Sequence, residues 1–212
     1  MKNLKITLSF LAVLTGVIVF SAFTTEKSSC STSEEAPVVV EKRIQTINMF
    51  VTHGHCSTPF AGRVENLEVY APAREDLGNP IENLKMSFDI DPNTFNVCVA
   101  EELTAVIKTP GLFIGENDEK LRFRSTNVYT MGLDWYQMNG VLSIKGVEKE
   151  VKFYVSGIRN PEDSMPSALI VEGQLDLWNW GIDYDKIIHG KSNEVPTKWM
   201  HLNMRIDMPS GC

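Results

Sequence analysis

From Val38 onward, apolar and polar residues alternate with a period of two, which indicates β-strands with one buried and one exposed face. The clearest runs cover residues 84–90, 137–145 and 200–208, and weaker ones cover 38–51, 60–70, 121–124, 151–155 and 169–177. Asp91-Pro92-Asn93 and Lys145-Gly146 give turn signals after two of them. The phase slips at Glu65-Asn66, as it does at a β-bulge. The pattern therefore predicts eight antiparallel strands.

Eight strands with one apolar face each fit a closed barrel and equally a two-sheet sandwich, and periodicity does not separate the two. Helical spacing is found only between Cys98 and Phe113, where an apolar pattern ends at Pro110-Gly111. We therefore expect an all-β domain with at most one short helix or lid in a connection.

Composition supports a folded domain and argues against nucleic acid as a partner. The chain has 212 residues, of which 43% are hydrophobic and 22% charged, which is typical of globular proteins. Its formal net charge is -7, so it lacks the basic excess that binding to phosphate backbones needs.

The N-terminus reads as a targeting segment. Lys2 and Lys5 precede the apolar run from Ile6 to Phe23, and a polar, Ser-rich stretch follows. We interpret residues 1–24 as a signal peptide or, alternatively, a membrane anchor, because the run is long enough to cross a bilayer. Residues 25–37 then form a flexible polar linker, residues 38–208 the barrel domain, and residues 209–212 a tail. We predict a periplasmic or secreted protein, with membrane association possible.

The segment Leu121–Val155 resembles the signature half of the YceI-like family, whose pattern runs from a phrase like ITFKST to one like GxLTIKGVTKPV. Further similarity lies in Phe60-Ala61-Gly62, in residues 109–113 and in Trp180-Gly181-Ile182. The resemblance runs from about residue 44 to residue 208. The residues in matching places of the signature are Phe123, Ser125, Thr126, Gly140, Leu142, Ile144, Lys145, Gly146 and Val147.

This resemblance implies a lipocalin-like, eight-stranded antiparallel barrel that is exported and binds a long polyisoprenoid chain, such as a quinone tail or prenyl lipid. It implies no catalytic residues, and no cofactor apart from the lipid ligand. Aromatic residues near strand ends are candidates for the rim, namely Phe113, Trp135, Trp178 and Trp180. The candidate lumen residues are Met86, Phe88, Leu121, Phe123, Met138, Leu142, Ile144, Phe153, Val171, Leu175, Leu177, Met200, Leu202, Met204 and Ile206.

Two interpretations of this apolar interior stay open. Methionine side chains are flexible and polarizable, which suits an adaptable lipid pocket, and they equally fill gaps in a packed core. The first interpretation is a carrier or store for an apolar lipid, and the second is a filled barrel that acts as an interaction or stress-response module. A homodimer is compatible with either. No nucleophile signature such as G-x-S-x-G occurs, so we predict that the protein is not an enzyme.

Cysteine and histidine residues suggest two further features. Export makes disulfides possible, and the place of Cys98 in the family's chain path leads us to predict a bridge between Cys56 and Cys98. His53 and His55 lie two residues apart beside Cys56, which makes a transition-metal site a weaker alternative. We favour hydrogen-bonded histidines at a strand end and predict no metal.

Overall fold

The computed structural model describes residues 45–53, 56–70, 84–98, 100–160, 166–183 and 198–208. The predicted signal peptide or anchor (1–24), the linker (25–37), the first part of the first predicted strand (38–44) and the tail (209–212) lie outside these ranges. Within them, no helix is both long and apolar enough to span a bilayer.

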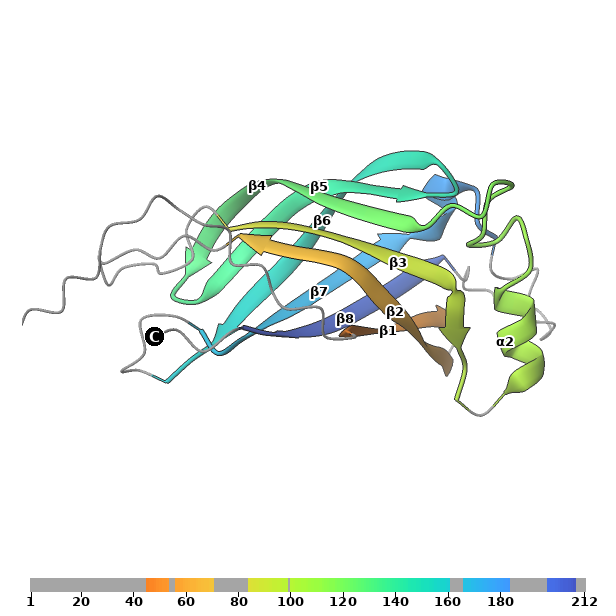
Figure 1. Cartoon of the computed structure of the whole chain (residues 1–212), viewed down its shortest axis with the longest axis horizontal. Coiled ribbons are helices and arrows are strands. Elements are labelled where there is room, and N and C mark those ends of the chain that lie inside the picture. Colours follow the sequence, from red (N-terminus) through yellow and green to blue (C-terminus); the bar gives the residue numbers. More distant parts are fainter. Residues whose placement is uncertain are drawn as a thin grey trace, which may run out of the picture. The chain divides into compact units, whose positions relative to one another are not determined.

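Eight antiparallel strands close into a barrel in which each strand pairs with the next along the chain and the last pairs with the first (Figure 1). A short helix, α2 (Glu101–Ile107), lies between the third and fourth strands, and a 3-10 turn, η1 (Leu177–Trp180), follows the seventh. The predicted barrel with one short helix is confirmed. The strands are β1 (Gln45–His53), β2 (Cys56–Tyr70), β3 (Lys85–Asn96), β4 (Leu121–Gly132), β5 (Trp135–Ile144), β6 (Val147–Ile158), β7 (Ala168–Asp176) and β8 (Trp199–Asp207).

Pairing of β1 on both sides decides between barrel and sandwich. Ile47 of β1 pairs with Gly62 of β2 and with Met204 of β8. The first and last strands therefore leave no open edge between them, as closure of a barrel requires.

The predicted bulge in β2 is confirmed. Glu65 pairs with Asp89 and Glu68 pairs with Ser87, so β2 has one more residue than β3 over this stretch. Asn66 takes a positive φ of 49°, and its side-chain amide donates a hydrogen bond to Asp89 Oδ2 at 2.9 Å. Asn is one of the few residues that enter the left-handed region at low cost, which explains why the alternation slips here.

The turn signal Asp91-Pro92-Asn93 predicts the end of the third strand, and this prediction is wrong because β3 continues to Asn96. The Asp91 carboxylate accepts a hydrogen bond from the Asn93 N–H at 2.9 Å, so the local turn does form. Pairing with β2 resumes beyond it, at Asn96 opposite Ala61. The turn is therefore a bulge within β3 and does not end the strand.

The barrel has two different ends. The α2 end carries α2, η1 and the β5–β6 turn, and the opposite end carries the β4–β5 hairpin, which we call the hairpin end (Figure 1). At the α2 end, Lys145 and Gly146 both take positive φ values, 53° and 72°. Two such residues make the tight turn that suits the twist of a hairpin, which confirms the predicted turn.

Candidate functional site

The inner face of the barrel is built almost entirely from apolar side chains. All fifteen candidate lumen residues are buried, with at most 4% of their surface exposed. These residues belong to one continuous hydrophobic cluster. Leu177 alone among them lies outside a strand, in η1. The set is Met86, Phe88, Leu121, Phe123, Met138, Leu142, Ile144, Phe153, Val171, Leu175, Leu177, Met200, Leu202, Met204 and Ile206.

The candidate set omits the inner faces of β1 and β2. Ile47, Met49 and Val51 are buried in the same cluster, as are Phe60 and Val64. The alternation in β1 is regular, so the rule that found the other strands would also have found these residues. Most of the nine methionines are therefore inside the barrel.

Three phenylalanine rings form a band along the barrel wall. The ring centroids of Phe88 and Phe123 are 5.1 Å apart, and those of Phe123 and Phe153 are 4.6 Å apart. A Cβ placed on Gly140 would lie 2.4 Å from the Phe123 ring, and one placed on Gly173 would lie 2.3 Å from the Phe153 ring. The Phe123 ring of β4 therefore lies over Gly140 of β5, and the Phe153 ring of β6 lies over Gly173 of β7. A side chain at either glycine would occupy the space that the ring now fills.

The α2 end is closed by an apolar plug. Phe113, in the connection between α2 and β4, is fully buried, and its ring lies 5.9 Å from Phe60 and 5.4 Å from Phe95. Ile107 of α2 is also fully buried. The structure thus places Phe113, a predicted rim residue, across one end of the barrel.

The predicted rim residues do not form a single rim. Trp178 and Trp180 lie at the α2 end, whereas Trp135 lies at the hairpin end. Trp178 is 50% exposed, but Trp180 is 4% exposed and its indole N–H donates a hydrogen bond to the Val147 carbonyl at 2.9 Å. The 3-10 turn points these two neighbours in different directions, which strand periodicity does not predict. Trp180 is therefore part of the packed α2 end.

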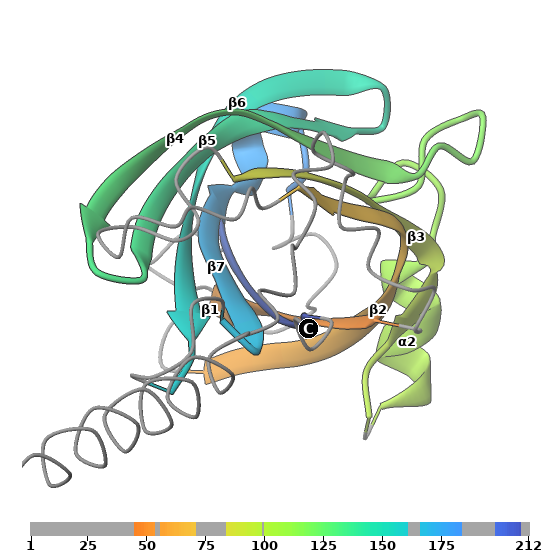
Figure 2. The ribbon, with the colours of Figure 1, turned by 60° about the vertical axis from the view of Figure 1, so that its left-hand side comes forward.

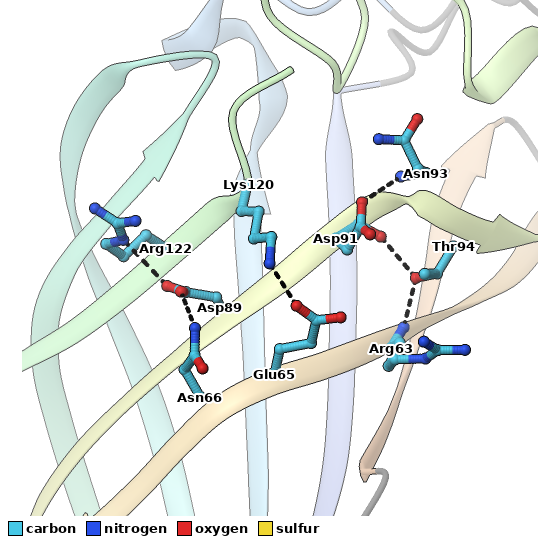
Figure 3. A network of polar contacts seen from close by, with 9 residues as sticks. All are labelled: Arg63, Glu65, Asn66, Asp89, Asp91, Asn93, Thr94, Lys120 and Arg122. Atoms are coloured by element: carbon cyan, nitrogen blue, oxygen red, sulfur yellow. Dashed lines mark hydrogen bonds and ion pairs between the residues drawn. The ribbon is translucent and has the colours of Figure 1, made fainter. Parts of the chain in front are cut away.

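A polar network covers the outer face of β2, β3 and β4 (Figure 3). Asp89, 8% exposed, binds Asn66 and Arg122, and Lys120 donates to Glu65. The hydrogen bond to Glu65 is the main reason that the pKa of Lys120 is raised. An adjacent outer hollow of about 230 Å³ is polar, so it offers little to an apolar ligand. It is lined by Asn66, Glu68, Ser87, Phe88, Asp89, Arg122, Phe123 and Arg124.

Lys145, in the segment most typical of the family resemblance, connects two parts of the α2 end. Its ammonium donates a hydrogen bond to the Gly111 carbonyl at 3.0 Å. Burial lowers the pKa of Lys145. Gly111 precedes the buried residues Leu112 and Phe113, so this bond ties the β5–β6 turn to the plug.

The predicted disulfide between Cys56 and Cys98 is not formed in the structure, where Cys98 is a free, exposed cysteine. Asn96, the last residue of β3, pairs with Ala61 of β2, and Cys98 lies in the turn that follows. Cys56 lies five residues from Ala61 along β2, which is roughly 16 Å of extended chain. Disulfides need Cα atoms about 4.4 to 6.8 Å apart.

The histidine cluster lies largely outside the described part of the chain. His55 and the side chains of His53 and Cys56 are not described, so the metal alternative stays a hypothesis. Among the described side chains, no group of three or more His, Cys, Asp and Glu residues is arranged to hold a metal ion. The described inner face offers dispersion contacts and exclusion of water, which suits an apolar ligand.

The chain matches the model of the YceI-like domain family over residues 38–206. The crystal structure of Burkholderia cenocepacia BcnA is similar with a TM-score of 0.58 and 12% identity, covering 76% of this chain and 94% of that one. A crystal structure of the Campylobacter jejuni YceI protein gives a TM-score of 0.46 and 11% identity, with 88% of this chain and 95% of that one covered. No protein with a curated description matches the sequence.

Proposed function

Because this chain belongs to the YceI-like domain family, we propose that it is an exported, non-catalytic protein that holds a long isoprenoid lipid in its barrel lumen. The lipid is the tail of a quinone or another prenyl chain, and the protein carries or stores it. The observation that carries the proposal is the closed barrel with an inner face of buried apolar side chains from all eight strands.

The inner face suits a long, featureless chain better than a compact polar ligand. At about 25 cal/mol per Å² of apolar surface buried, a prenyl tail contributes several kcal/mol before any head-group contact. Methionines of β1, β3, β5 and β8 give the wall adaptable side chains. Affinity should therefore depend mainly on tail length, and selectivity for the head group should be modest.

The hairpin end is the better entrance for a lipid. The α2 end is plugged by Phe60, Phe95 and Phe113. At the hairpin end, Thr130 pairs with Tyr136, whose side chain is buried inside the barrel. Paired residues point to the same face, so Thr130 also faces inward, yet it is exposed. Exposed residues that pair with buried ones also occur near the α2 end, in β6, so the aromatic plug at that end carries the choice of entrance.

A filled barrel is the second candidate. The contacts between the rings of Phe88, Phe123 and Phe153 favour it, because these side chains occupy part of the lumen. In that case the protein works through its outer surface, as an interaction or stress-response module without a lipid.

Mass spectrometry of an organic extract tests the two candidates. The protein is purified without detergent from cells that make the full chain. One isoprenoid lipid per protein in the extract supports the carrier hypothesis. Leu142→Trp and Phe153→Trp place larger side chains on the inner face and should lower the lipid content with the fold retained. Lys152→Trp, on the exposed face of β6, is the matched control. No lipid in the wild type, together with a loss of about 1 to 3 kcal/mol in the two inner variants, would indicate a filled barrel.

Export is the remaining part of the proposal, and it is supported by the charged start and apolar run of residues 1–24. Mass spectrometry of the mature chain should find an N-terminus near Thr24. An intact Met1 in the membrane fraction would show an anchor, and a diacylated Cys30 would show a lipoprotein.

A further inference from the structure

We infer that the tip of the β4–β5 hairpin is a membrane-docking element that inserts into the interfacial layer of a lipid bilayer. The element consists of Tyr129, Met131, Leu133, Trp135 and Tyr154, which we call the tip patch. The inference extends the proposed carrier function by assigning where the protein meets the source of its ligand.

The tip patch exposes large apolar side chains at the end of a protruding hairpin. Leu133, in the turn, is 65% exposed, and Tyr129, Met131 and Trp135 are 51%, 45% and 46% exposed. Tyr154, on the neighbouring strand, is 39% exposed. Figure 2 shows the β4–β5 hairpin flaring away from the ring formed by the other strands.

Strand register makes the patch continuous. Tyr129 pairs with Gln137, and Gln137 pairs with Tyr154, so the two tyrosines flank Gln137 on the outer face. The ring centroids of Trp135 and Tyr154 are 6.5 Å apart. Trp and Tyr have an apolar ring with a polar atom at one end, and they are therefore enriched where hydrocarbon meets water.

The tip carries no unpaired charge that would oppose insertion. Residues 127–137 contain a single charged residue, Asp134. Its carboxylate forms an ion pair with Arg159 at 2.6 Å, and the two side chains are only 15% and 12% exposed. On the outer face, Lys152 of β6 pairs with Asn139 further from the tip. Glu172 of β7 pairs with Tyr154 at the edge of the patch, and its carboxylate accepts a hydrogen bond from Asn203 at 2.9 Å. Insertion of residues 127–137 of the hairpin therefore brings no unpaired charge into the interfacial layer.

The size and shape of the patch favour a bilayer over a second copy of the chain. Aromatic side chains present about 150 to 250 Å² each, so five large side chains that are about half exposed offer roughly 400 to 500 Å². A stable dimer needs about 800 Å² from each partner. The protein has a net charge of -7, so attraction to anionic lipids is not the driving force. We therefore assign the patch to a zwitterionic bilayer surface.

Vesicle binding tests the assignment with matched variants. Sucrose-loaded vesicles of palmitoyl-oleoyl-phosphatidylcholine are sedimented with the wild type, Leu133→Asp, Trp135→Ser and Trp178→Ser. Trp178 is the control, because it is 50% exposed but lies at the α2 end. All proteins are produced from the full chain, so any contribution of the apolar residues 6–23 to vesicle binding is the same in each of them. We expect a ten- to hundredfold lower partition coefficient for Leu133→Asp, a severalfold lower one for Trp135→Ser, and no change beyond twofold for Trp178→Ser.

Fluorescence quenching by brominated phosphatidylcholine shows whether the tip itself enters the bilayer, even if another segment of the chain also binds the vesicle. Bromine in the upper acyl chain should quench Trp135 fluorescence, so the quenched fraction should fall in Trp135→Phe and stay unchanged in Trp178→Phe. Equal partitioning of all variants, or equal quenching in the two phenylalanine variants, would overturn the assignment. So would a dimer of the wild type in sedimentation velocity that Leu133→Asp dissociates without any vesicle binding.

Lipid extracts of the same proteins separate this inference from the carrier proposal. A wild type that contains isoprenoid lipid but does not bind vesicles through the tip overturns the docking element and leaves the carrier standing. A wild type that docks through the tip but contains no lipid, even after incubation with quinone-loaded vesicles, overturns the carrier and supports the docking element.

Discussion

Replacing the glycines beneath the phenylalanine band tests the packing of the lumen most directly. In Gly173→Ala the new methyl would lie 2.3 Å from Cδ1 and 2.6 Å from Cε1 of Phe153. In Gly140→Ala it would lie 2.4 Å from Cε2 of Phe123 and 2.5 Å from the Arg124 carbonyl oxygen. Carbon atoms pack best at about 3.5 to 4.0 Å, so both substitutions force a movement.

The two substitutions should differ in size because they press on different kinds of atoms. At Gly173 the three nearest atoms all belong to the Phe153 ring, which can tilt, so we expect a loss of about 1 to 2 kcal/mol in the free energy of unfolding. At Gly140 the Arg124 backbone must also move, and we expect about 2 to 3 kcal/mol. Gly132→Ala is the control, because nothing lies within 4 Å of its Cβ position, and it should change stability by less than about 0.5 kcal/mol.

Double variants separate ring contacts from backbone contacts. In a Phe153→Leu background, Gly173→Ala should become nearly neutral. In a Phe123→Leu background, Gly140→Ala should retain about half its effect, because the Arg124 oxygen is still close. Urea unfolding with constant m measures each value. Two results would refute the description of rings lying over glycines. One is that Gly173→Ala lowers the free energy of unfolding equally in the wild type and in Phe153→Leu. The other is that Gly132→Ala lowers it as much as Gly140→Ala does.

Three other predictions concern local features. Gly146→Ala should lower the free energy of unfolding by about 1 to 2 kcal/mol, because φ is 72° there, and Gly146→Asn should lower it less; urea unfolding measures both. In the same assay, Arg159→Met should cost about 2 to 3 kcal/mol by leaving the poorly exposed Asp134 carboxylate without its cation. Arg205→Met, whose ion pair with Asp207 is more than half exposed, should cost less than about 0.5 kcal/mol. Peptide mapping after alkylation without reductant should recover Cys98 as a modified thiol, and its recovery in a disulfide would contradict the structure.

Local patterns in the sequence were sufficient to predict the strands, the β-bulge at Glu65-Asn66, the tight turn at Lys145-Gly146 and the short helix. The inward set was predictable for the same reason, since side chains alternate between the two faces of a strand whatever its neighbours are. The turn at Asp91-Pro92-Asn93 was predictable from the sequence. That β3 continues beyond it was not, because the continuation depends on pairing with β2.

Features that join distant segments were decided only by the tertiary structure. Alternation shows which face of a strand is apolar but not which strand lies beside it, so closure through β1 and β8 was not predictable from periodicity. The contact of Phe153 with Gly173, the ion pair of Asp134 with Arg159 and the burial of Trp180 depend on the register between strands or on the path of a connection. The tip patch was predictable only in part. Trp135 was a candidate rim residue, but the register of β4, β5 and β6 decides that Tyr129, Trp135 and Tyr154 gather on the outer face.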